Sequence, residues 1–440
     1  MSYAIHRSLL QNPAKAARGD GVYLVDVNGK RFLDGCGGAA VSCLGHSHAA
    51  VVAAIHEQAK TLPYAHTSYF TTDVMEALAE KLVTNAPGMG KVLLLSGGSE
   101  TIEAALKLSR QYFVEVGQPE RHLYIARRQS YHGNTLGALS VGGNEWRRQK
   151  FGPIMMPGHH VAPCFEYREM QDGETPAEYG QRAANELEIK LLELGPNNVA
   201  AFIAETVVGA TAGGVPPAPG YFKRIREICD KYGVHLILDE VMCGTGRTGT
   251  MMAYEQEGIE PDMVTMAKGL AAGYQPVGAL LCKNEITDAI RAGSGFFQHG
   301  HTFMGHATAV AASLATLNAI DGERLLNNVQ TRGASMLTRL REALSDHPNV
   351  GDVRGRGLFI GVEFVADRDT RAPLDPAEKT HNKVQQAAME QGLMIYGMGG
   401  TIDGRTGDHV LLAPPYIINE EQESELLEKL TAAISAACGT

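Results

Sequence analysis

Short apolar runs that end abruptly at polar residues constrain the fold of this chain more than any other feature. Residues 234–241, VHLILDEV, are apolar until Asp239 and Glu240, and a second run that begins at Met263 stops at Lys268. Strands this uniformly apolar are buried on both faces, as in a parallel sheet that helices cover. Between about residues 70 and 320 such runs alternate with helical segments. We therefore expect an α/β fold with a doubly wound sheet.

Three further apolar runs lie upstream and end in the same way. One run stops before the turn that contains Gly98 and Ser99, a second leads to Tyr131 and His132, and a third ends at Glu205. The carboxyl ends of parallel strands meet at one edge of the sheet, and ligands bind at that edge. We therefore expect all five polar ends to converge on one site.

An amine and a carboxylate stand at two of these strand ends. Lys268 can form a Schiff base and Asp239 can keep a pyridine nitrogen protonated, which is what a protein needs to hold pyridoxal phosphate. Backbone N–H groups at Gly98 and Ser99 suit a phosphate, and Tyr131 can stack on a flat ring. Each group also has a structural interpretation: a helix cap for the glycine-serine turn, a core position for Tyr131 and an exposed strand end for Lys268.

Composition excludes several classes of protein. The 440 residues predict two or three domains at about 100–200 residues each. A net charge of −10 argues against nucleic acid as a partner, because binding to phosphates needs a basic face. The one dense basic cluster, Arg147, Arg148 and Lys150, is interpreted as a solvated loop. No apolar run approaches the roughly 18–20 residues that span a bilayer, so no membrane partner is expected.

Cysteine and histidine spacing argues against a metal centre. The seven cysteines are scattered and form no C-x-x-C pair, so neither a disulfide framework nor a zinc site is implied. No histidine pair follows a metal-binding spacing, and the amino terminus lacks an apolar signal core. We expect a cytoplasmic protein without a metal.

The two ends of the chain differ in character from its middle. Residues 21–34 alternate apolar and polar side chains around Asn28 and Gly29, which predicts a hairpin with a two-residue turn. After about residue 320, predicted helices over 325–345 and 376–391 alternate with β runs over 358–364 and 410–412. We expect an amino-terminal segment, 1–60, that belongs to a small domain, a large cofactor-binding domain, 61–320, and a small α+β carboxyl-terminal domain, 321–440.

Several motifs, taken in order, resemble the class III pyridoxal-phosphate-dependent aminotransferases of fold type I. They are SGGSETIEAALKLSRQY, SYHGNTLGALS, VHLILDEVMCGTGRTG, PDMVTMAKGLAAGYQPVGA, HGHTFMGH and DHVLLAPPYII. The resemblance implies a large domain with a mainly parallel seven-stranded sheet, and a smaller α+β domain built from both termini. It also implies a homodimer whose active site lies at the subunit interface.

The resemblance assigns roles by position. Lys268 resembles the Schiff-base lysine and Asp239 the partner of the pyridine nitrogen. The implied cofactor-binding residues are Gly98, Ser99, Tyr131, His132, Glu205, Asp239, Val241, Lys268 and Thr302. Among them, Val241 and Tyr131 resemble the residues on the two ring faces, and Thr302 resembles the threonine that reaches the phosphate in the neighbouring subunit. Thr206 stands where the family usually has a proline after the glutamate.

Departures from the family pattern indicate the substrate branch. The acetylornithine, ornithine and γ-aminobutyrate branches have carboxylate-binding arginines at two positions that are Asn134 and Leu411 here. They have an acidic partner at a third position, which is Ala210 here. Arg405 is similar to the mobile arginine of the ω-amino acid:pyruvate and amine:pyruvate transaminases; a solvated loop arginine is the alternative. Tyr64 is a candidate for the substrate pocket, with core packing as its alternative.

These residues predict one activity and leave alternatives open. We expect a transaminase that moves an amino group from an amine or ω-amino acid to a keto acid, pyruvate being the acceptor expected, by ping-pong chemistry through pyridoxamine phosphate. A racemase, decarboxylase or aminomutase of the same fold could use the same lysine and aspartate. A nucleotide-binding module is disfavoured, because no G-x-G-x-x-G or Walker lysine follows a strand at the right place.

Overall fold

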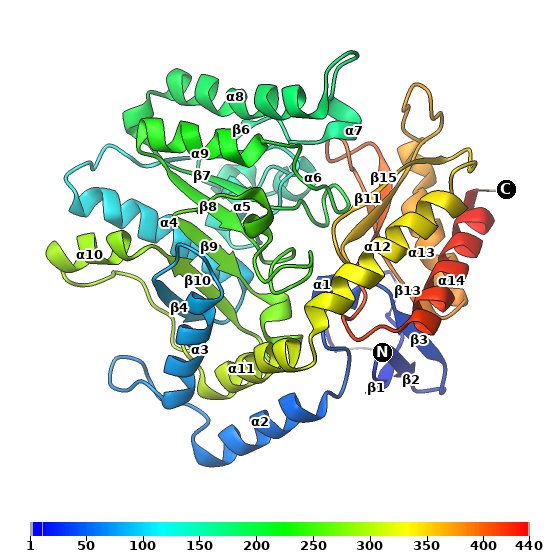
Figure 1. The fold of residues 1–440 in the computed structure, drawn as a ribbon, viewed down its shortest axis with the longest axis horizontal. Helices are drawn as coiled ribbons and strands as arrows, with labels where there is room; N and C mark the ends of the chain where they lie inside the picture. The colour runs from blue at the N-terminus through cyan, green and yellow to red at the C-terminus, as the bar shows by residue number, and fades with distance from the viewer. Residues whose placement is uncertain (1–2, 11, 439–440) are drawn as a thin grey trace.

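A seven-stranded sheet forms the centre of the molecule in the computed structural model, which describes residues 3–10 and 12–438 (Figure 1). The strand order is β4-β10-β9-β8-β7-β5-β6, and only β10 runs antiparallel to its two neighbours. The predicted, mainly parallel seven-stranded sheet is therefore confirmed. Its strands are β4 (Lys91–Leu95), β5 (Leu123–Arg127), β6 (His159–Val161), β7 (Val199–Glu205), β8 (His235–Asp239), β9 (Met263–Met266) and β10 (Gly278–Cys282).

Helices cover both faces of this sheet, which explains its uniformly apolar strands. Ile237 of β8 packs in one core with the helices α4 (Gly98–Glu115), α5 (Leu136–Val141) and α10 (Asn284–Ala292). Its neighbours Leu236 and Leu238 point to the opposite face and pack in a second core with α8 (Pro176–Leu194) and α9 (Tyr221–Tyr232). Because successive strand residues alternate between the two faces, a strand covered on both sides must be apolar throughout.

Two smaller sheets complete the fold, and the first of them joins the two ends of the chain. One has the order β1-β2-β3-β13, and β3 pairs in parallel with β13; the other has the order β11-β12-β15-β14. Figure 1 shows the amino-terminal strands beside the carboxyl-terminal helices. The elements are β1 (Ala16–Asp20), β2 (Tyr23–Asp26), β3 (Arg31–Asp34), β11 (Val350–Gly355), β12 (Ile360–Phe364), β13 (Leu393–Met394), β14 (Tyr396–Gly399), β15 (Asp408–Leu412), α12 (Leu325–Ala343), α13 (Thr380–Glu390) and α14 (Glu420–Cys438).

The remaining helices connect these layers. The helix α2 (Ala49–Thr61) packs against α11 (Ala307–Gly322), next to α3 (Asp73–Thr84). The division of the chain at residues 60 and 320 stays a proposal, and this packing of α2 argues for an earlier first boundary. Short helices are α1 (Gly37–Ala40), α6 (Glu145–Arg148), α7 (Glu166–Glu169) and the 3₁₀ turns η1 (Gly152–Ile154), η2 (Pro196–Asn198), η3 (Ala253–Glu257), η4 (Lys268–Ala271) and η5 (Pro376–Glu378).

Two local predictions were wrong. The β2–β3 hairpin closes over three residues, 27–29, because the Asp26 N–H donates to the Lys30 carbonyl at 3.0 Å. The Asp26 side chain also accepts from the backbone N–H groups of Asn28 and Lys30, and such bonds stabilise a longer loop than the predicted two-residue turn. The helix expected over 376–391 is interrupted at Lys379, whose φ of 49° is left-handed.

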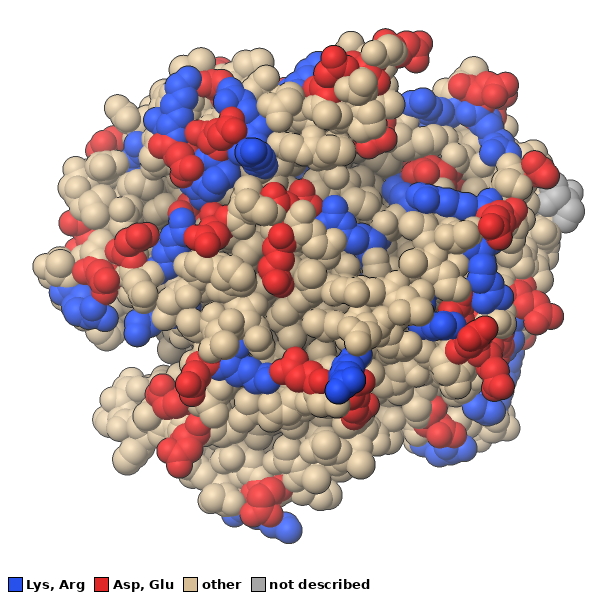
Figure 2. Space-filling model, viewed as in Figure 1, with Lys and Arg blue, Asp and Glu red and all other residues tan. Residues whose placement is uncertain are grey.

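Lysine and arginine side chains are interspersed with aspartate and glutamate over the visible face of the molecule (Figure 2). Among the described residues, helices that are both long and apolar enough to cross a bilayer are absent. That observation agrees with the apolar runs of the sequence, which are of strand length.

Candidate active site

A cavity of about 490 Å³ lies at the carboxyl edge of the seven-stranded sheet. The ends of β4, β5, β7, β8 and β9 all reach this edge, as the sequence predicted, because these strands run in the same direction. Strand register places Glu205 directly beside Asp239. Eight of the predicted residues line the cavity: Gly98, Ser99, Tyr131, His132, Glu205, Asp239, Val241 and Lys268.

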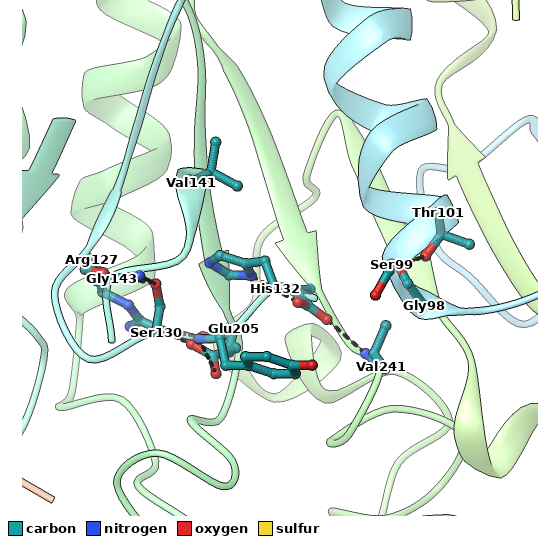
Figure 3. A network of polar contacts seen from close by, with 12 residues as sticks. Gly98, Ser99, Thr101, Arg127, Ser130, His132, Val141, Gly143, Glu205 and Val241 are labelled. Atoms are coloured by element: carbon teal, nitrogen blue, oxygen red, sulfur yellow. Dashed lines mark hydrogen bonds and ion pairs between the residues drawn. The ribbon is translucent and has the colours of Figure 1, made fainter. Parts of the chain in front are cut away.

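Asp239 is held in one orientation by two hydrogen-bonding partners. One carboxylate oxygen, Oδ2, lies 2.8 Å from Nδ1 of His132, and the other accepts from the Val241 N–H at 3.0 Å (Figure 3). Asp239 and His132 are both buried. A carboxylate fixed in this way can direct its charge toward a ring nitrogen in the cavity.

Lys268 has a strained backbone conformation and an amine whose pKa is lowered. It follows β9 as the first residue of η4 with a φ of 47°, a left-handed conformation that costs a non-glycine residue about 1–3 kcal/mol. Burial lowers the pKa of its amine to about 8, and the positive charge of Arg147 acts in the same direction, against Asp239 and Glu205. Because a neutral amine is the nucleophile that attacks a carbonyl, this environment favours Schiff-base chemistry.

The start of α4 forms a cradle beside the cavity. A side-chain carbon on Gly97 would meet no atom within 4 Å, whereas one on Gly98 would stand 3.0 Å from Cγ1 of Val241. Glycine at position 98 therefore lets Val241 approach the helix start closely. The Ser99 hydroxyl accepts from the Asn134 N–H at 3.0 Å, and free N–H groups at the amino end of this 18-residue helix suit a phosphate.

Glu205 is a buried carboxyl group with an unsatisfied oxygen. Its Oε1 accepts from the Tyr131 N–H at 3.3 Å. Its Oε2 is buried, has no hydrogen-bond partner among the described residues and lies 4.0 Å from Nη2 of Arg127. Burial raises the pKa of Glu205, although the nearby charges of His132 and Arg127 oppose that rise. Figure 3 shows Glu205, Arg127 and His132 around this part of the site.

Three predicted residues do not line this cavity. The Tyr64 hydroxyl donates to the carbonyl oxygen of Thr302 at 2.8 Å, so these two residues lie together elsewhere. Arg405 is exposed in the loop before β15, where its backbone N–H donates to the Asp403 side chain at 2.8 Å. Their substrate and cofactor roles stay predictions, and the one proposed for Thr302 needs a second subunit.

Sequence reasoning missed one charged residue at the site. Arg147 was interpreted as part of a solvated loop, but it is half-buried and its guanidinium lies 4.5 Å from the ring centroid of Tyr131. Nothing in the local pattern of residues 144–148 could have indicated this contact, which depends on how α6 packs. The cavity is completed by residues to which sequence analysis assigned no role, among them Val41, Val207, Met242, Gln275, Pro276 and Val277.

The residues of the cavity fit pyridoxal phosphate. A helix start can hold the phosphate, the Asp239 carboxylate can face a ring nitrogen, and Lys268 lines the same cavity. Oε2 of Glu205 and Nε2 of His132 have no hydrogen-bond partner within the described part of the chain, and a polar cofactor in the cavity could supply one. Fold and site together define an enzyme of the pyridoxal-phosphate-dependent type.

Comparison with known proteins gives the family. The chain belongs to the class III aminotransferases, whose family profile matches residues 5–434. It is 44% identical over 441 residues to an uncharacterized aminotransferase of Schizosaccharomyces pombe, covering 99% of this chain and 95% of that protein. It is 36% identical over 424 residues to a diaminobutyrate–2-oxoglutarate transaminase of Halomonas elongata, covering 95% and 89% of the two chains. A PLP-bound amine transaminase from an uncultivated Pseudomonas species superposes with a TM-score of 0.92 at 35% identity, covering 99% and 98% of the two chains. The protein is therefore an aminotransferase that depends on pyridoxal phosphate.

Proposed function

We propose that this aminotransferase transfers an amino group from an amine or ω-amino acid to a keto acid, with pyruvate as acceptor, in two half-reactions. The observation that carries the proposal is that Lys268 and the anchored carboxylate of Asp239 line one cavity. The structural similarity to an amine transaminase supports an amine donor. The Halomonas relative is named for 2-oxoglutarate, which makes that keto acid the competing acceptor.

We assign the chemistry to the chain's own residues as follows. When bound, pyridoxal phosphate supplies an electron sink for the substrate carbon that carries the amine. The Lys268 amine, whose pKa burial lowers to about 8, would bind the cofactor carbonyl and would then move the proton at that substrate carbon. Asp239, oriented by His132 and Val241, keeps a proton at the ring nitrogen.

The remaining assigned residues position the cofactor. Gly98 and Ser99 bind the phosphate at the start of α4, Tyr131 and Val241 pack on the ring, and Glu205 orients it from the edge. The proposed Thr302 contact is made across the interface of a homodimer, which accounts for its distance from the cavity of its own chain. We also propose a reducing, cytoplasmic location, which the free thiols of all seven cysteines support.

A donor panel tests the transaminase proposal against the other reactions open to this fold. The purified holoenzyme is given β-alanine, taurine, γ-aminobutyrate or an arylalkyl amine, each with pyruvate, with 2-oxoglutarate or without a keto acid. We expect carbonyl product beyond one equivalent per active site only when a keto acid is present, and more with pyruvate. Donor turnover that needs no keto acid would identify a racemase, decarboxylase or aminomutase instead. Lys268→Ala serves as the inactive control.

A further inference from the structure

Arg147 lies on α6, with its guanidinium over the ring of the cavity residue Tyr131. The side chain of Asn144 accepts from the backbone N–H of Arg147 at 3.3 Å and so begins this short helix. The guanidinium lies 4.5 Å from the Tyr131 ring centroid and 5.8 Å from that of Trp146. The Arg405 loop packs on the same helix. A side-chain carbon built on Gly404 would stand only 3.1 Å from the backbone nitrogen of Trp146.

This half-buried cation has no anionic partner in the described part of the chain. Among residues 3–10 and 12–438, no carboxylate oxygen lies within 4.0 Å of Arg147, and its guanidinium donates only to the Met398 sulfur, at 3.9 Å. Its Nε is buried and has no hydrogen-bond partner among these residues. The adjacent Arg148, by contrast, pairs with Glu145 at 3.7 Å. A buried N–H donor without an acceptor is costly, so Arg147 has unused capacity to bind an anion.

The charge of Arg147 also acts inside the cavity. It opposes protonation of Lys268, adding to the effect of burial that lowers the pKa of that amine. It also opposes the rise that burial causes in the pKa of Tyr131. An anion bound at Arg147 would therefore lie within electrostatic reach of the reacting amine, on the side of Tyr131 where α6 and the Arg405 loop meet.

We propose that Arg147 binds the carboxylate of the amino-acid or keto-acid substrate. The proposal rests on the transaminase function above and names the substrate group that this part of the site recognises. A guanidinium presents a planar fork of N–H donors that matches the two oxygens of a carboxylate. Amine donors that lack a carboxylate do not use this contact, so Arg147 distinguishes such donors from substrates that carry a carboxylate.

An equilibrium experiment tests the contact without turnover. The affinity of the holoenzyme for propanoate, a carboxylate that cannot react, is measured by calorimetry in the wild type, Arg147→Gln, Arg147→Lys and the matched control Arg148→Gln. We expect Arg147→Gln to weaken binding by about tenfold to hundredfold, the range for a charge-assisted hydrogen bond. Arg147→Lys should lose less, and Arg148→Gln should stay within about threefold of the wild type.

Kinetics separate substrate binding from support of the Tyr131 ring. We expect Arg147→Gln to lower kcat/KM for pyruvate by about tenfold to hundredfold, while kcat/KM for the uncharged acceptor propanal changes by less than about threefold. The proposal would be overturned by equal losses of kcat/KM with both acceptors or by an unchanged affinity for propanoate. It would also be overturned if the variant altered the dimer–monomer equilibrium and still bound propanoate as the wild type does. A wild-type enzyme that binds propanoate through Arg147 but uses no keto acid would instead refute the transaminase function alone.

Discussion

Removing the Lys268 amine should stabilise the cofactor-free protein while it abolishes activity. Burial lowers the pKa of this amine from its ordinary 10.5 to about 8, so below pH 8 the folded protein carries an unfavourable buried charge. The unfolded chain binds more protons than the folded one between pH 8 and 10.5, and stability therefore rises with pH across that window. At about 1.4 kcal/mol for each pH unit, the penalty at pH 7 is at most about 3 kcal/mol, because the side chain is not fully buried.

Chemical denaturation of the cofactor-free protein at fixed protein concentration measures this difference. At pH 7, Lys268→Met should increase the free energy of unfolding by up to about 3 kcal/mol. The gain should shrink between pH 8 and 10.5, where the wild-type amine loses its proton. The exposed Lys223 on α9 provides a matched control, Lys223→Met, which should show no such trend. A gain in stability that does not depend on pH, or a Lys268→Met protein less stable than the wild type, would show that burial does not lower the pKa of this amine.

Three further predictions concern the cofactor. Asp239→Asn should lower kcat by at least about a hundredfold while cofactor is retained, because a neutral amide lacks the charge that stabilises a protonated ring nitrogen; near wild-type steady-state rates would contradict this. Gly98→Ala places a methyl group 3.0 Å from Val241 and should weaken cofactor affinity about tenfold in equilibrium dialysis; an unchanged affinity would mean that the helix start is not the cradle. Hybrid dimers that pair a Thr302→Ala chain with a Lys268→Ala chain should contain one site of full cofactor affinity, because one site then has both an intact Lys268 and the intact Thr302 of the other chain. If Thr302 acted within its own subunit, neither site would have full affinity.

The strand-end residues could be predicted from the sequence because their signal is local. An apolar run that stops at Asp239 or Glu205 marks both the strand and its end, and the structure places these ends within a residue of the prediction. The prediction of a two-residue hairpin turn was wrong for a reason that is also local. The Asp26 side chain accepts two backbone N–H groups, and this bonding outweighs the preference of Asn28-Gly29 for a two-residue turn.

The side chains that bring an amine, a carboxylate and a phosphate cradle to one sheet edge can be identified from the sequence, because apolar patterning is encoded over a few residues. How those groups behave depends on the packing of the folded chain. The lowered pKa of Lys268, the bond from His132 to Asp239 and the position of Arg147 over Tyr131 depend on burial and on distances between segments far apart in the chain. Electrostatic and hydrogen-bond energies vary with those distances and with the exclusion of water, and a linear pattern of residue types specifies neither.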